Sequence, residues 1–232
     1  MNTRTLTRTA LFAALTAAGA FIRIPLGYSS ITLQFFFTAM AGCLLGPVWG
    51  PVSQTVYVAL GLIGLPIFTQ GGGLTYLLQP TCGFLIGLIP AAWVIGLLTA
   101  RRPPHPVRTA LACLAGLAVL YAVGLPYMAV ILNQYMGKAM DFSAILWAGM
   151  LPFLPGDMLK IAVTAALAPL LQKRLSRVIE EELTPLQRET LLAYYIQQKN
   201  IPTIAAERSV AKSTVSRTLR RAEGKVRRFL RY

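Results

Sequence analysis

Apolar residues in this chain gather into runs that are long enough to cross a lipid bilayer. A membrane-spanning helix needs about 20 predominantly apolar residues, because the hydrocarbon layer is about 30 Å thick. We identify six runs of roughly this length, at residues 6–25, 31–49, 51–67, 77–99, 109–133 and 145–171. Only 13% of the 232 residues are charged, where a soluble domain has about 25%. The sequence therefore predicts an all-α domain with six transmembrane helices and excludes an ordinary soluble enzyme.

Positive charges predict how these helices are oriented in the membrane. Lys and Arg cluster within residues 4–8, 101–108 and 173–177, which are short segments beside the apolar runs. Because cytoplasmic loops are enriched in Lys and Arg, six spans place all three clusters and both termini in the cytoplasm. Gly46-Pro47 and Gly50-Pro51 separate the second run from the third and predict a sharp cytoplasmic turn.

The last 60 residues have a different composition from the rest. Residues 173–232 carry 14 Lys and Arg and 6 Asp and Glu, whereas residues 1–172 carry 8 and 2. This change predicts a basic, hydrophilic appendage. We divide the chain into a membrane domain at 1–175, a linker at 176–182 and a C-terminal domain at 183–232.

The sequence offers no set of residues for catalysis or for metal binding. Gly137-Lys138 and Gly224-Lys225 are not followed by the Ser or Thr that completes a nucleotide-binding phosphate loop. The single His lies in a basic segment, and no paired carboxylates or Ser/His/Asp set can be assembled. Three Cys residues in apolar surroundings are typical of free buried thiols. We therefore predict that the protein is not an enzyme and holds no metal or cofactor.

The sixth apolar run contains a pair of ionisable residues, Asp157 and Lys160. A separation of three places them on neighbouring positions of one helical face. At about 1.5 Å per residue, Asp157 lies roughly 20 Å from the cytoplasmic end near Leu171, in the outer half of the membrane. Charges in a bilayer are costly and usually face a polar cavity. The pair is either a structural ion pair or a substrate site, and we favour the substrate site.

A second polar group of residues lies in the predicted outer loop before the fourth span. Gly71–Gly73 allow the backbone to approach a ligand closely and to move as a lid. Tyr76 offers an aromatic face and a hydroxyl, while Gln79 and Thr81 offer hydrogen bonds. The topology puts this loop on the same side as Asp157, so both features are expected to share one pocket.

Small residues mark one face of the first predicted helix. Ala10, Ala14 and Ala18 recur at four-residue spacing. Such spacing lets another helix approach closely, because helix association in membranes depends on van der Waals packing. The alanines either pack within the chain's own bundle or form a docking surface for a partner subunit, and the sequence leaves both interpretations open.

Three segments follow one another along the chain: Ile24–Gly27 with Ile31–Gln34, the loop from Gly71 to Gly87 with Pro80-Thr81, and Leu151–Lys160 with Pro155-Gly156-Asp157. In this order they resemble the BioY family. The resemblance covers about 1–175. It departs where family members commonly have Gly, at Gln79 and Cys82. BioY proteins are the biotin-specific membrane subunits of energy-coupling-factor vitamin transporters.

The resemblance implies a six-helix vitamin-binding bundle in the plasma membrane of a prokaryote. Its partners would be biotin, a transmembrane coupling subunit and ATP-binding cassette ATPases, with the three alanines on the docking helix. Asp157 and Lys160 would bind the ureido group and the carboxylate of biotin, in an order that stays open. The full set of candidate biotin-binding residues is Asp157, Lys160, Tyr76, Thr81, Gln79, Gly73 and Gln34. Two alternatives remain, namely a membrane-anchored transcription regulator that senses biotin and a biotin transporter that works without ATPase partners.

The C-terminal domain is predicted to contain three helices. Leu183–Glu189 begins the first, with Thr184 as its N-cap and Pro185 at its first position. The second lies near Thr203–Arg208, and the third runs from Lys212 towards Arg228.

These helices resemble the helix-turn-helix of region-four sigma factors, over about 183–230. The matching residues are Ile204-Ala205, Val210, Thr214-Val215 and Arg217, with Ser209 at the turn. The resemblance implies a small cytoplasmic domain whose third helix enters the major groove of DNA. Its candidate DNA-binding residues are Ser213, Thr214, Ser216, Arg217, Arg220 and Arg221. Alternatively, the basic helices lie against anionic lipid headgroups of the bilayer.

Overall fold

The chain forms two compact units, which are described separately. One unit comprises residues 7–169, and the other comprises residues 170–232 with residues 1–6. In the computed structural model, the described residues are 3–26, 29–100, 104–177, 183–195, 197 and 199–229. Within them, four helices are long and apolar enough to cross a membrane, at Gln34–Leu62, Cys82–Thr99, Pro106–Tyr135 and Leu154–Gln172. We call residues 7–169 the bundle and the helices after residue 183 the tail.

The first helix is shorter than predicted, and a β-hairpin follows it. Helix α1 spans Thr3–Phe21, and strands β1 (Arg23–Leu26) and β2 (Ser29–Thr32) pair antiparallel. Pro25 cannot continue a helix because it lacks a backbone N–H, and the β-branched Ile24 before it favours a strand. The helix of the first predicted run, 6–25, thus ends at Phe21, and the two-stranded hairpin is a small addition to the all-α architecture that the sequence predicted.

Helix α2 (Gln34–Leu62) is folded back on itself at Gly46. This glycine has φ 78° and ψ −171°, outside the helical region, and a positive φ favours glycine. The two halves run antiparallel, so that a Cβ on Gly50 would lie 3.1 Å from the Cα of Gly42. The predicted sharp turn at Gly46-Pro47 is therefore confirmed. The halves measure about 18 and 24 Å at 1.5 Å per residue, less than the hydrocarbon thickness, so the count of six spans stays a prediction.

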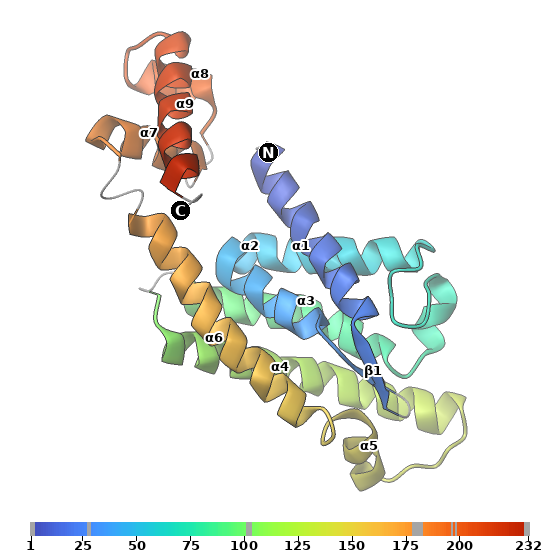
Figure 1. Cartoon of the computed structure of the whole chain (residues 1–232). Coiled ribbons are helices and arrows are strands. Elements are labelled where there is room, and N and C mark those ends of the chain that lie inside the picture. Colours follow the sequence, from blue (N-terminus) through green and yellow to red (C-terminus); the bar gives the residue numbers. More distant parts are fainter. Residues whose placement is uncertain are drawn as a thin grey trace. The chain divides into compact units, whose positions relative to one another are not determined.

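Helix α3 lies between α2 and α4 (Figure 1). It spans Cys82–Thr99, so it starts later than the predicted run at 77, and a short 3-10 helix, η1 (Leu74–Leu78), precedes it. Helix α4 (Pro106–Val130) continues into a π-helical turn, η2 (Ile131–Tyr135), and the two include the predicted run 109–133. A Cβ on Gly96 would lie 2.6 Å from the backbone nitrogen of Pro47. Glycine thus allows α3 to approach the α2 turn closely.

The sixth predicted run is broken into two helices. Helix α5 spans Phe142–Gly149 and helix α6 spans Leu154–Arg177. A single helix over 145–171 was therefore the wrong prediction, because Pro152 and Pro155 fit only where backbone N–H groups are not needed. The break places Asp157 in the first turn of α6, where the helix dipole favours a negative charge.

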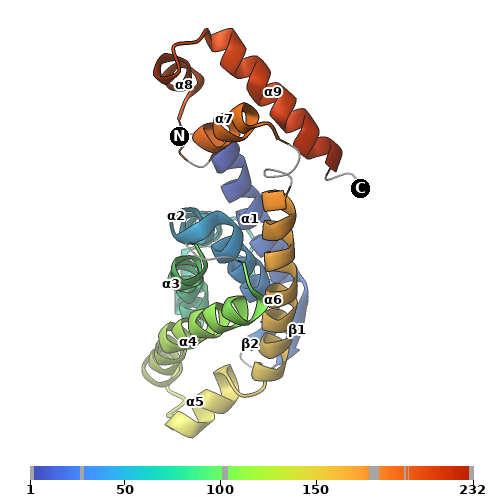
Figure 2. The ribbon, with the colours of Figure 1, turned by 90° about the vertical axis from the view of Figure 1, so that its left-hand side faces the viewer.

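The tail contains α7 (Pro185–Tyr195), α8 (Ile201–Glu207) and α9 (Lys212–Phe229), and α9 packs against both others (Figure 2). Thr184 and Gln187 form a capping box: the Gln187 N–H donates to Thr184 Oγ1 at 3.4 Å, and the Thr184 N–H donates to Gln187 Oε1 at 3.2 Å. This confirms the predicted start of the first tail helix. Residues 178–182 of the predicted linker, and Arg101 and Arg102, lie outside the described residues.

Candidate ligand-binding site

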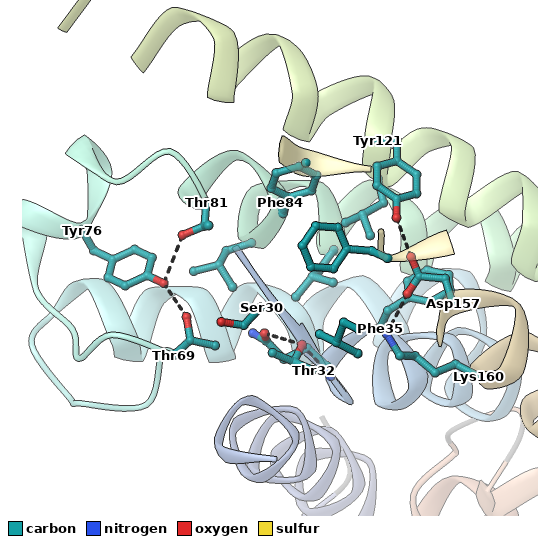
Figure 3. Close-up of a pocket in the computed structure, with 17 residues that line it drawn as sticks. Ser30, Thr32, Phe35, Thr69, Tyr76, Thr81, Phe84, Tyr121, Asp157 and Lys160 are labelled. Carbon is teal, nitrogen blue, oxygen red and sulfur yellow. Dashed lines mark hydrogen bonds and ion pairs between the residues drawn. The ribbon is translucent and has the colours of Figure 1, made fainter. Parts of the chain in front are cut away.

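A pocket lies in the bundle among β2, the start of α2, α3, α4 and the start of α6 (Figure 3). It holds about 660 Å³ of space, including the part open to solvent. Small-molecule sites are typically lined by apolar side chains with a few polar groups, as this pocket is. Its lining residues are Ser30, Ile31, Thr32, Gln34, Phe35, Thr69, Tyr76, Thr81, Phe84, Leu85, Leu88, Leu120, Tyr121, Gly149, Phe153, Asp157 and Lys160. The structure thus brings five of the predicted residues together: Gln34, Tyr76, Thr81, Asp157 and Lys160.

One end of the pocket is formed by a buried ion pair. Asp157 and Lys160 are 5% and 9% exposed, and Lys160 Nζ donates to Asp157 Oδ1 at 2.7 Å. The Tyr121 hydroxyl, from α4, donates to the other carboxylate oxygen at 2.5 Å. Both oxygens of Asp157 are therefore engaged. An ammonium carries three hydrogens, so Lys160 retains the capacity to donate to a ligand.

The other end of the pocket is formed by hydroxyl groups. The Tyr76 hydroxyl lies 3.0 Å from Thr69 Oγ1 and 3.4 Å from Thr81 Oγ1. Figure 3 shows this hydroxyl cluster across the pocket from Asp157, with Phe84 and Phe35 between the two ends. Hydroxyls both donate and accept hydrogen bonds. The site therefore suits an elongated ligand that has a neutral polar group, an apolar middle and an anionic group.

Gln34 contributes an amide to the pocket wall. Its Oε1 accepts from the Thr32 hydroxyl at 2.9 Å, and its Nε2 donates to the Tyr57 hydroxyl at 2.8 Å. These bonds hold the side chain of Gln34 between β2 and the second half of α2. Two hydrogen bonds thus orient the amide.

Two predicted binding residues, Gly73 and Gln79, lie outside the pocket wall. Gly73 has φ 101°, and its N–H donates to the Gly61 carbonyl at 2.7 Å. A Cβ on Gly72 would lie 2.1 Å from the Leu65 carbonyl oxygen. The glycines therefore bring the loop against the end of α2 rather than against the pocket. Gln79 is half-buried and ends η1.

Four polar residues of the wall were missed by sequence reasoning: Ser30, Thr32, Thr69 and Tyr121. Tyr121 sits in an apolar span 36 residues from Asp157, so no local spacing connects the two. Ser30 and Thr32 had a usable signal, because they stand beside Gln34 in a polar stretch just before an apolar run.

The alanines of α1 lie on an exposed face. Ala10, Ala14 and Ala18 are exposed, whereas Ala13 and Thr16 are buried. The predicted small-residue stripe is thus separate from the face by which α1 packs in the bundle. Of the two interpretations left open by the sequence, this arrangement favours a docking surface.

The candidate residues of the tail lie on α9. Ser213, Thr214, Arg217, Arg220 and Arg221 are exposed, and Ser216 is half-buried. The inward face of α9 instead carries Val215, Leu219 and Ala222, which are buried. Helix α9 is therefore amphipathic, with its basic residues turned outward.

The cysteines take no part in the pocket's polar groups. Cys43, Cys82 and Cys113 are buried and form no disulfide, which confirms the prediction of buried thiols. Among the residues that the structure describes, no three His, Cys, Asp or Glu side chains gather into a metal site.

Comparison with known proteins gives consistent matches over the first three quarters of the chain. The profile of the BioY family matches residues 1–177. The "probable biotin transporter BioY" of Lysinibacillus sphaericus is 42% identical over 191 residues, which cover 82% of this chain and 97% of the relative. The "biotin transporter BioY" of Rhodobacter capsulatus is 41% identical over 174 residues, which cover 71% and 91%. A crystal structure of "the S-component for biotin from an ECF-type ABC transporter" matches with a TM-score of 0.62 and 28% identity, covering 74% of this chain and 92% of that one.

Proposed function

The chain belongs to the BioY family, and on this premise we propose that it captures biotin as the substrate-binding subunit of an ECF-type ABC transporter. Family membership makes it a multi-pass membrane transport protein and not an enzyme, as the sequence predicted. The relatives named as biotin transporters, and the solved biotin S-component, support the choice of ligand.

The observation that carries the proposal is the chemistry of the pocket's two ends. Biotin has a ureido ring, a thioether and a carboxylate, so it needs hydrogen bonds, apolar walls and one cation. Lys160 supplies the cation beside Asp157, and the hydroxyls of Tyr76 and Thr81 supply neutral hydrogen bonds. Gln34 adds an amide. Gln79 and Gly73 remain candidates through the loop that they shape.

Calorimetry on the purified chain tests this proposal. We expect Asp157→Asn to bind biotin at least about 30-fold more weakly than wild type, because it leaves a buried ammonium without its partner. Asp141→Asn is the matched control, since Asp141 caps α5 at an exposed position. A folded wild-type protein that binds no biotin would overturn the proposal.

We further propose that α1 docks the transmembrane coupling subunit, which links the chain to the ATPases. The exposed face of Ala10, Ala14 and Ala18 supports this assignment. We expect Ala14→Leu to abolish uptake with all partners present while biotin binding persists, whereas Ala166→Leu on the exposed face of α6 leaves both intact. Uptake by this chain alone would instead favour a transporter without ATPases, and biotin binding without uptake would favour a sensor.

The proposed topology has six spans: α1, the two halves of α2, α3, α4 and α6. Both termini then lie in the cytoplasm, with the domain boundaries at 1–175, 176–182 and 183–232. A single Cys introduced at Lys138 should react with a membrane-impermeant reagent from outside intact cells, while one introduced at His105 should not. The reverse pattern would contradict the orientation.

A second function is favoured by the surface charge of the tail. We propose that α8 and α9 form a helix-turn-helix, similar to region four of sigma factors, that binds double-stranded DNA. Ser209 sits in the turn with φ 52°, a conformation that non-glycine residues adopt mainly in tight turns. Residues of α9 would enter the major groove, namely Ser213, Thr214, Ser216, Arg217, Arg220 and Arg221.

The acidic residues of the described tail do not oppose this assignment. Glu189 pairs with Arg208 at 3.2 Å, and Glu207 pairs with Lys199 at 2.7 Å. Glu223 accepts a hydrogen bond from the Tyr195 hydroxyl at 3.0 Å. Each acidic group is thus engaged with a neighbouring tail residue, which leaves the exposed arginines of α9 to attract phosphates.

Titration of the full chain in nanodiscs with double-stranded DNA tests the second function. We expect the double variant Arg217→Ala, Arg221→Ala to show a weaker salt dependence than the wild-type protein. The slope of log K for DNA binding against log salt concentration should become less negative by about 2, because each phosphate contact contributes about one. Lys138→Ala, in the bundle, should leave the slope unchanged. Binding to anionic vesicles without DNA binding at low salt would assign the basic face to the membrane instead.

A further inference from the structure

Hydrogen bonds among a row of buried polar residues connect the pocket wall to α1, and the first of them runs from the Thr38 hydroxyl to the backbone carbonyl of Gln34. The row comprises Gln34, Thr38, Gln54 and Thr16, and the last three are fully buried. Thr38 Oγ1 lies 2.9 Å from Gln54 Oε1, and Gln54 Nε2 donates to Thr16 Oγ1 at 3.3 Å. Polar groups inside a membrane bundle are expensive and usually functional. The pocket as described uses only Gln34, so the rest of the row needs its own explanation.

The residue at the pocket end of the row, Gln34, can form a hydrogen bond with a ligand. Gln34 lines the pocket, and its amide nitrogen gives one hydrogen to Tyr57. An amide nitrogen carries two hydrogens, so Gln34 can also donate to a bound molecule. Tyr57 in turn donates to the Ile67 carbonyl at 3.1 Å. A ligand that accepts a hydrogen bond from Gln34 therefore contacts the first half of α2 directly and the second half through Tyr57.

The middle of the row has two alternative acceptors for one proton. The Thr38 hydroxyl lies 2.9 Å from the backbone carbonyl of Gln34 and 2.9 Å from Gln54 Oε1. A hydroxyl has a single hydrogen to donate. A small movement of Gln34 can therefore shift this hydrogen bond towards or away from Gln54, which gives the row two states that a ligand can bias.

The far end of the row holds the helix with the exposed alanines. Thr16 lies two residues from Ala14 and two from Ala18, on the buried face of α1. Its hydroxyl donates to the Phe12 carbonyl at 2.9 Å and accepts from Gln54. Because a helix moves as a rigid element, a change in the Gln54–Thr16 bond changes how α1 presents its alanine face.

We propose that Gln54, linked to Thr38 and Thr16, is a positioning residue that transmits occupancy of the biotin pocket to the alanine face of α1. The inference rests on the proposed biotin-binding function and deepens it, because it makes docking depend on cargo. Gln54 contacts neither the pocket nor the exposed face. Its role is to join the two.

A probe on α1 tests the coupling in the full chain in nanodiscs. A Cys introduced at Ala14 is exposed, whereas the three native cysteines are buried. We expect biotin to change its rate of reaction with a maleimide at least about 2-fold. In this background, Gln54→Met and Thr16→Val should remove the biotin-dependent change while biotin still binds.

Thr109→Val is the matched control for Thr16→Val. Thr109 is also buried, and its hydroxyl donates to the carbonyl of His105, the N-cap residue of α4, at 3.1 Å. With Thr109→Val, biotin should still change the maleimide reaction rate of the Cys at residue 14 in full. Thr16→Val replaces one hydroxyl by a methyl group, so it gives an answer even where Gln54→Met fails to fold.

Two results would overturn the inference. One is a full biotin-dependent change in both Gln54→Met and Thr16→Val, and the other is a wild-type protein that binds biotin with no change at residue 14. Calorimetry on the same samples separates these results from failure of the proposed function, in which the wild-type protein binds no biotin at all.

Discussion

The bundle and the tail are both helical, but their helices pack by different means. In the bundle, glycines bring backbones together: a Cβ on Gly96 would lie 2.6 Å from a backbone atom of Pro47. In the tail, side chains such as Ile204 and Val215 fill a small core, and a Cβ on Gly224 would meet nothing within 4 Å. Lipid provides no hydrophobic force between helices, so close approach must replace it.

The polar groups of the two regions differ in the same way. The bundle encloses two of its charged residues, Asp157 and Lys160, beside a pocket. The tail turns its charges, such as Arg217 and Arg221, towards solvent. This difference is the basis for the two proposals, a small-molecule ligand for the bundle and a large partner for the tail. The family profile covers the bundle and ends at residue 177, before the tail.

Replacing one Lys in each region should give the largest difference in the free energy of unfolding. Lys160→Met leaves Asp157 buried without its cation, and we expect the free energy of unfolding to fall by about 3–5 kcal/mol. Lys199→Met breaks an ion pair whose side chains are 33% and 47% exposed, and exposed pairs contribute at most about 1 kcal/mol. Hydrogen exchange on peptides from each region measures both values. Equal losses would contradict the contrast between a buried and an exposed pair.

The same Gly→Ala change should lower the stability of the bundle and raise the stability of the tail. Gly96→Ala forces a methyl group against backbone, so we expect a loss of about 1–3 kcal/mol in the stability of the bundle. Gly224→Ala fills open space in α9 and should stabilise the tail by roughly 0.5–1 kcal/mol, because Ala loses less backbone entropy. Thermal unfolding with a probe in each region checks the signs, and two changes of the same sign would refute this account of packing.

The smallest expected difference is in the pH dependence of two helix caps, one in each region. The Asp141 carboxylate accepts from the Ser143 hydroxyl and the Ala144 N–H, and these bonds hold its pKa below its usual value. Its capping of α5 is thus fully present above about pH 4, near the ordinary pKa, and is lost as the pH falls through the lower pKa of the folded state. Asn200 caps α8 with a neutral amide.

Amide exchange in α5 and α8 as a function of pH, corrected for intrinsic rates, checks this comparison. We expect α5 to lose protection at acidic pH and Asp141→Asn to remove that dependence, while the capping of α8 by Asn200 does not vary with pH. An α5 whose protection is unaffected by pH in the wild-type protein would show that the Asp141 cap does not limit opening of this helix.

Features that depend on neighbours in the sequence could be predicted. The turn at Gly46-Pro47 follows from two Gly-Pro pairs, and the start of α7 follows from Thr184 and Pro185. The Asp157–Lys160 pair follows from a three-residue spacing on one helix. Each of these features depends on residues that are close together in the sequence, so it can be predicted without knowledge of the fold.

Features that depend on contacts across the fold could not be predicted. Tyr121 reaches Asp157 only because α4 packs beside α6, and Thr69 reaches Tyr76 only because the loop folds over the end of α2. The break before α6 also escaped prediction, since hydropathy does not distinguish one apolar helix from two that are separated by a proline turn. Gly73 was assigned to the pocket because glycine permits close approach, but its partner is the backbone of Gly61.

We propose above all that the bundle alone binds biotin, through the buried ammonium of Lys160. Calorimetry with biotin on the full chain in nanodiscs tests it with one substitution in each region, Lys160→Met and Lys199→Met. We predict that Lys160→Met weakens binding by at least about 30-fold, and that Lys199→Met binds as the wild-type protein does. Unchanged binding by a folded Lys160→Met protein, or an equal loss in both variants, would contradict the account.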